Sequence, residues 1–162
     1  MTLHSMPTLL ATGHSTAILG AISTTLERSD EAPFWRQKTL PFVEAILSVL
    51  IPLREQHLLF DPEGNAHETL TPALLLRWCD LMSLKTLAFT LAKSNDQEKL
   101  VRTKITTQTY QPIDLEILGK YLSGYTINLE DESIDFPIRN YNLHIGISDL
   151  ISKILNGNIT NV

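Results

Sequence analysis

The stretch SDEAPFWRQKTLPFVEAILSVLIPLREQ, residues 29–56, is the densest apolar run of the chain, and Pro41 and Pro52 lie inside it. Its apolar residues recur at spacings of three and four, which is the pattern of a helix that buries one broad face. Pro33 suits the first turn of a helix, where a missing N–H has no cost. The pattern continues past Pro41 and changes after Pro52. We therefore expect a core helix that begins near Pro33, bends at the first internal proline and ends near the second.

The same stretch is too short for a membrane span. Its apolar part, residues 40–53, falls below the roughly 20 residues that a bilayer requires, and Glu44 lies near its middle. The first residues of the chain include no positively charged leader, so they make a poor signal peptide. The only cysteine, Cys79, excludes an intrachain disulfide and suits a reducing compartment. We therefore expect a cytoplasmic protein.

The composition is that of an ordinary globular protein. Of the 162 residues, 43% are hydrophobic and 19% are charged, a balance that disordered chains do not have. A chain of this length suits one domain with a hydrophobic core. The formal net charge of -5 argues against tight, unspecific nucleic-acid binding, which depends on Lys and Arg side chains that neutralise phosphates. A basic face can still coexist with an acidic total.

Later segments carry further helical patterns. Thr71 followed by Pro72 is a strong helix start, while Ser83 and Leu84 leave room for a break in the helix that follows. Asn95 opens a segment with the spacing of a capping box. The expected helices cover residues 72–93, 95–109, 112–122 and 138–155.

The segments between these helices predict loops. DPEGN, residues 61–65, has the proline and glycine of a tight turn between two short apolar arms, so we expect a small hairpin or loop there. TINLEDESIDFP, residues 126–137, has the composition of an acidic linker. We therefore predict an all-α fold, an irregular bundle of kinked helices with one small hairpin-like loop. A single domain is expected over residues 1–162, with flexible ends at 1–11 and 157–162.

No motif for catalysis or cofactor binding is visible. GHSTAILG, residues 13–20, lacks the spacing and the lysine of a phosphate-binding loop. The alternation in DPEGN is superficially that of a calcium loop, but its glycine comes one place early. Cys79 lies in an apolar run and is expected to be buried and inert. We therefore expect no catalytic, cofactor-binding or metal-ligating residues, because the histidines also lack the paired spacing of a zinc site. These histidines are His4, His14, His57, His67 and His144.

Two sets of side chains have both a structural and a binding interpretation. Trp35 and Trp78 lie on apolar helical stripes, which favours core anchors over a platform for stacking bases. For the densest basic cluster, the favoured interpretation is a solvated helix face, and the alternative is a weak nucleic-acid or partner-binding patch. It consists of Lys93, Lys99, Arg102 and Lys104.

Four segments occur in an informative order. The first, residues 34–55, opens with Trp35 and the basic Arg36 and ends in LRE. It is followed by LTPALLLRWCDLMSLKTLA, by YLSGY at residues 121–125, and by NYNLHIGISDLISKIL at residues 140–155. This order resembles the helical insert of the type IV coupling proteins, the cytoplasmic ATPases of conjugation and type IV secretion.

The resemblance covers about Thr12 to Leu155, nearly the whole chain. Gly124 and Tyr125 match the LPGY turn of that insert, whereas Ser123 stands where the family commonly has proline. The chain also lacks the Walker motifs, which in the family lie in the flanking nucleotide-binding domain. An insert excised from such an ATPase would lack the Walker motifs in the same way.

The resemblance implies the all-α domain of a coupling ATPase, a membrane-distal cap that selects DNA–protein or protein substrates before a hexameric motor passes them on. DNA, relaxosome proteins or adaptors are the implied partners, together with the parent ATPase domain. The domain alone is expected to be a monomer, to carry out no reaction and to bind neither cofactor nor small molecule. The alternative is a helical docking module that binds adaptors or effectors without touching DNA.

Overall fold

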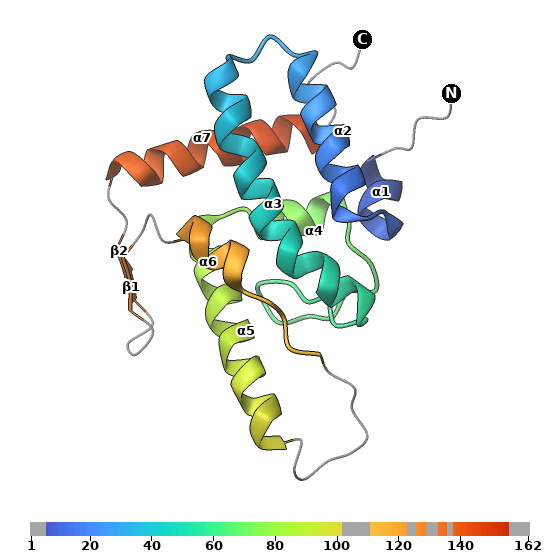
Figure 1. The fold of residues 1–162 in the computed structure, drawn as a ribbon, viewed down its shortest axis with the longest axis vertical. Helices are drawn as coiled ribbons and strands as arrows, with labels where there is room; N and C mark the ends of the chain where they lie inside the picture. Colours follow the sequence, from blue (N-terminus) through green and yellow to red (C-terminus); the bar gives the residue numbers. More distant parts are fainter. Residues whose placement is uncertain (1–5, 102–110, 123–125, 129–132, 136–137, 156–162) are drawn as a thin grey trace.

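Seven helices and one two-stranded hairpin make up the part of the chain that the structure describes (Figure 1). The computed structural model describes residues 6–101, 111–122, 126–128, 133–135 and 138–155, with the backbone alone for 95–101, 126–128, 133–135 and 138–140. The predicted all-α fold is confirmed. The elements in chain order are α1 (Met6–Thr12), α2 (Ser15–Glu27), α3 (Pro33–Glu55), α4 (Pro72–Arg77), α5 (Leu81–Val101), α6 (Glu116–Leu122), β1 (Thr126–Asn128), β2 (Ser133–Asp135) and α7 (Ile138–Leu155).

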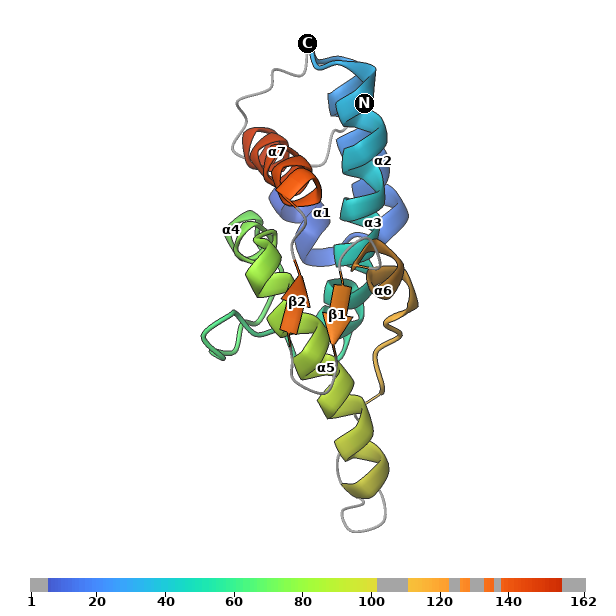
Figure 2. The same cartoon turned by 90° about the vertical axis from the view of Figure 1, so that its left-hand side faces the viewer.

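The long helix α3 is the centre of the fold. It begins at Pro33, as predicted, and runs through Pro41 and Pro52 to Glu55. Helix α2 lies alongside it, while α6 and α7 pack on other parts of its surface (Figures 1 and 2). All seven of the described helices contribute buried side chains to a single hydrophobic core around α3.

The end of α3 is closed by a residue in the left-handed region. His57 has a φ of 59°, and its backbone N–H donates to the carbonyl of Arg54 at 3.0 Å. The N–H of Leu58 donates to the carbonyl of Leu53 at 2.9 Å. These two bonds form a Schellman motif, which turns the chain away from the helix axis into the loop that follows.

The predicted helix over residues 72–93 is two helices. Its start is confirmed, because Thr71 Oγ1 accepts a hydrogen bond from the Leu74 N–H at 3.1 Å. The break falls at residues 78–80, however, and not at the predicted Ser83. There the Asp80 carboxylate accepts from the Ser83 N–H at 3.2 Å and so caps the first turn of α5.

A second predicted boundary is also wrong. Asn95 does not begin a new helix, because α5 continues without interruption through this position to Val101. Residues with good capping side chains are compatible with the interior of a helix when the backbone hydrogen bonds on both sides continue. The remainder of the predicted helix, residues 102–109, lies outside the described part of the chain.

The predicted acidic linker contains a small antiparallel hairpin. Strands β1 and β2 pair Ile127 with Ile134, flanked by the pairs Thr126 with Asp135 and Asn128 with Ser133. The two triplets share a polar–Ile–polar alternation that suits strand pairing, and the sequence analysis did not use it. Around DPEGN we expected a small hairpin or loop, and the structure has a loop with one isolated antiparallel bridge between Phe60 and Ala66.

The first part of the chain is more ordered than we expected. Residues 6–11, which we assigned to a flexible end, belong to α1, and Leu10 is fully buried in the core. The predicted flexible end at 157–162 lies outside the described residues. Among the helices that the structure describes, none combines the length and the hydropathy needed to cross a bilayer.

Candidate functional site

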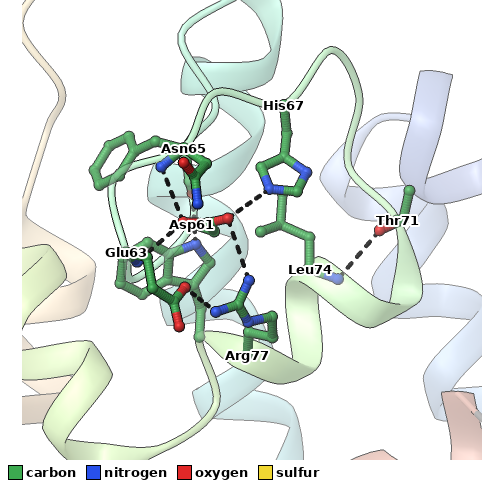
Figure 3. Close-up of polar contacts among 9 residues, drawn as sticks. Asp61, Glu63, Asn65, His67, Thr71, Leu74 and Arg77 are labelled. Atoms are coloured by element: carbon green, nitrogen blue, oxygen red, sulfur yellow. Dashed lines mark hydrogen bonds and ion pairs between the residues drawn. The ribbon is translucent and has the colours of Figure 1, made fainter.

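The turn after α3 gathers several charged side chains around Asp61 (Figure 3). Asp61 Oδ1 accepts hydrogen bonds from the backbone N–H groups of Glu63 at 2.9 Å and Asn65 at 3.0 Å. Its Oδ2 lies 2.9 Å from His67 Nε2 and accepts from Arg77 Nη1 at 3.2 Å. Arg77 also pairs with the Glu63 carboxylate. The buried Asp61 carboxylate therefore joins the turn to the last residue of α4.

The electrostatics of this turn keep Asp61 ionised. The hydrogen bond from His67 is the main cause that lowers the pKa of Asp61 to about 2, against the opposing effect of burial. The bonds to Asn65 and the charge of Arg77 lower this pKa further. A carboxylate offers about four acceptor positions, and these partners use all of them. The described residues contain no group of His, Cys, Asp or Glu able to hold a metal ion. We interpret Asp61 as the organiser of the loop.

A second polar cluster lies inside the core, around His144 of α7. His144 Nε2 is 2.6 Å from the carbonyl oxygen of Cys79, and Nδ1 is 2.7 Å from the Tyr121 hydroxyl. Because a carbonyl only accepts, Nε2 carries the proton and Nδ1 accepts from Tyr121. The Phe42 ring packs edge-on against the imidazole, with 5.0 Å between the ring centroids. The cluster joins α3, α6 and α7 to the break between α4 and α5.

Cys79 and His144 are both held in their neutral forms by burial. Burial raises the pKa of the Cys79 thiol to about 12, so this group does not supply a thiolate nucleophile. The thiol donates to the Leu75 carbonyl at 3.2 Å. The prediction that Cys79 is buried is confirmed. Burial also lowers the pKa of His144, although the bond to Cys79 and the charge of Asp80 oppose this effect.

We expect acid to destabilise the fold through His144. Above the ordinary His pKa of about 6.5 both states are neutral, whereas at lower pH the unfolded chain takes up a proton that the folded His144 resists. The free energy of unfolding should therefore fall between about pH 7 and pH 5, at no more than about 1.4 kcal/mol per pH unit. Urea titrations across this range measure the loss, and His144→Gln should be less pH-dependent than the parent. Equal pH-dependence of the two proteins would contradict this assignment. Asp61 does not change the stability in this pH range, because its contribution to the free energy of unfolding is lost only as the pH falls from about 4 towards 2.

The two tryptophans differ in their surroundings. Trp78 is fully buried, as predicted. Trp35 is partly buried and lies against Gly146 of α7, where an added Cβ would come within 2.4 Å of the ring. Its other neighbour is Phe34, whose ring meets Trp35 edge-on with 5.2 Å between the centroids. Phe34 belongs to the apolar stretch that we expected to bury one broad helical face, but it is 49% exposed.

Of the predicted basic cluster, the structure describes only the side chain of Lys93. Lys93 is exposed on α5, and Lys99 lies further along the same helix, in the part described by its backbone alone. Arg102 and Lys104 lie outside the described residues. The proposal that these four side chains form a patch therefore stays a prediction.

A cavity that the sequence analysis missed lies between the end of α2 and the start of α3. Its volume is about 240 Å³. Polar and charged side chains share its wall with apolar ones. Because no helix was expected over residues 15–27, the sequence pattern did not predict that residues 23–27 would face residues 33–40. The lining residues are Ser23, Leu26, Glu27, Pro33, Arg36, Gln37 and Leu40.

The fold and the clusters define an all-α protein whose buried polar groups hold its helices together. No protein-family model matches the chain, and neither the curated proteins nor the solved structures contain a match.

Proposed function

We propose that this chain is a recognition domain that selects protein or DNA–protein substrates for a type IV coupling ATPase. The main support is the state of its most reactive side chains. The Asp61 carboxylate is fully hydrogen-bonded, both ring nitrogens of His144 have partners, and the Cys79 thiol is protonated and buried. Groups used in this way maintain the fold and are poorly placed for chemistry on a substrate. The outer surface is left for recognition.

The segments that carry the resemblance also support the proposal, because they pack on one another. Trp35, near the start of α3, lies on Gly146 of the closing helix α7. The hydroxyl of Tyr121, the first residue of YLSGY, is 2.7 Å from Nδ1 of His144 in the closing helix. Such a unit could be inserted as one block into a larger ATPase. On this proposal the domain lies on the cytoplasmic side of the membrane with its parent motor.

The test is photo-crosslinking of the full protein in the cells that make it. A photoreactive amino acid replaces the exposed Phe34 and, as a control, the exposed Glu68 in the loop before α4. We expect cross-links from position 34, absent from position 68, to substrates or adaptors of a secretion or conjugation system. Identical products at the two positions, or none at either, would contradict the proposal.

DNA contact is tested separately. Because the net charge is -5, we expect the chain alone to leave a labelled DNA duplex unbound at about 150 mM salt. Fluorescence anisotropy measures this directly. Salt-sensitive binding that is lost when Lys99, Arg102 and Lys104 are all changed to Gln would instead assign the domain to DNA recognition.

A further inference from the structure

The cavity between α2 and α3 combines charged, polar and apolar side chains in one wall. The turn that joins the two helices lies at one end of the fold (Figure 1), and the lining residues lie on both sides of this turn. Arg36 and Glu27 both line the cavity, yet they form no ion pair with each other. The side chains of these two residues and of Gln37 make no hydrogen bond or ion pair with any other residue that the structure describes. Their polar groups are therefore available to a ligand.

The cavity is partly open to solvent, so its size limits only the part of a ligand that enters it. Its volume of about 240 Å³ lies below the roughly 300–1,000 Å³ of pockets that bind drug-sized molecules and cofactors. A single side chain or chain terminus of a protein partner fits this space better than a nucleotide. The apolar part of the wall, formed by Leu26, Pro33 and Leu40, suits the methylene groups of such a side chain.

The polar part of the wall determines which chemical class of ligand the cavity can bind. The guanidinium of Arg36 is a planar fork that matches a carboxylate, and the amide of Gln37 can donate a further hydrogen bond. Glu27 in the same wall disfavours a doubly charged anion such as a phosphate, because like charges at short range repel. A ligand with one carboxylate and an adjacent neutral or basic group satisfies both side chains.

We propose that the α2–α3 cavity binds a carboxylate of a protein partner, with Arg36 as its anchor. The inference rests on the proposed recognition function and adds to it the chemistry of the contact. The carboxylate belongs to a glutamate or aspartate side chain or to the C-terminus of the partner.

The test uses the whole chain labelled with ¹⁵N and a set of short peptides. One peptide has a single internal glutamate and an amidated end, a second has glutamine in its place, and a third has glutamine with a free C-terminal carboxylate. Backbone amide shifts of residues 23–40 report binding. We expect weak binding of the first or third peptide, and the arm that binds identifies the source of the carboxylate. Equal binding of the glutamine peptide with the amidated end, or no binding of any peptide, would overturn the proposal.

Variants separate a specific site from a general charge effect. Arg36→Gln should lower the affinity for the peptide that binds by roughly tenfold or more, because the charged guanidinium is lost. Its melting temperature should stay close to that of the parent, because the Arg36 side chain has no ion pair or hydrogen bond with the rest of the described chain. Lys38→Gln removes a cation of the same helix that does not line the cavity, and should leave the affinity unchanged. An equal loss in both variants would contradict the site.

Free glutarate is the last probe. Binding of glutarate as tight as that of the peptides would mean a small-molecule site and would overturn the role of a protein partner. The outcomes for this site and for the domain are distinguishable. If the peptides fail but cross-links from position 34 are found, only the cavity proposal falls; if both fail, the recognition function falls with it.

Discussion

Trp78→Ala is expected to lower the free energy of unfolding by roughly 3–5 kcal/mol, as truncation of a fully buried aromatic side chain commonly does. Trp78 is 0% exposed, and its ring packs edge-on against Phe60 with 5.5 Å between the centroids. Its indole N–H donates to the Phe60 carbonyl at 2.9 Å. Removal of the ring therefore leaves a cavity in the core and an acceptor without its donor. Urea denaturation followed by circular dichroism measures the loss.

The matched control is Trp78→Phe. It keeps most of the apolar volume and removes the indole donor, so the loss should be smaller, about 1–3 kcal/mol. The alanine variant should also loosen the turn after α3, because Phe60 directly precedes Asp61. Hydrogen exchange at the Asp61 amide, which donates to the Asn65 carbonyl at 2.9 Å, reports that effect. If the two variants lost equal stability, the packing of the ring would not be the main contribution.

The position of Trp78 also explains why the break between α4 and α5 was predicted at the wrong residues. The periodicity of residues 72–93 continues across the break, so local pattern alone predicts one helix. The structure interrupts it at residues 78–80, where Trp78 reaches a carbonyl of the preceding loop and Asp80 caps α5. The first of these bonds joins residues 18 positions apart, and no local signal in the sequence specifies it. By contrast, α3 was placed correctly, because Pro33 and the spacing of its apolar residues are local signals.

The polar clusters and the cavity were harder to predict for the same reason. The sequence indicated a turn at DPEGN, but the pairing of Asp61 with Arg77 depends on how α4 packs over that turn. The contact of His144 with Tyr121 joins two residues that lie on different helices and 23 positions apart in the sequence. The α2–α3 cavity required a helix, α2, that was not predicted at all. Chemical roles here follow from tertiary packing, which the spacing of residue types does not encode.

The second large effect is expected at Arg54, in the LRE run that ends α3. Its side chain is only 6% exposed, and its guanidinium donates to the carbonyls of Leu10 and Gly13, both at 2.8 Å. These carbonyls lie at the end of α1 and just beyond it, where a cation complements the negative end of the helix. The chain has no room for a larger residue at this corner, since a Cβ on Gly13 would come within 2.7 Å of the Leu9 carbonyl oxygen. Arg54 therefore holds α1 against α3.

Arg54→Met is expected to lower the free energy of unfolding by roughly 2–4 kcal/mol, because one buried and one partly buried carbonyl lose charged donors that a methionine cannot replace. Arg54→Lys should lose less, since a lysine keeps the charge but its single ammonium group does not reproduce the fork. Glu55→Gln is the control. It removes the exposed partner of Arg54 and should change stability little, because exposed ion pairs contribute little. Hydrogen exchange should rise first in α1 in the Arg54→Met variant. A uniform rise across all helices, or an equal loss in Glu55→Gln, would show that the two carbonyl contacts do not carry the effect.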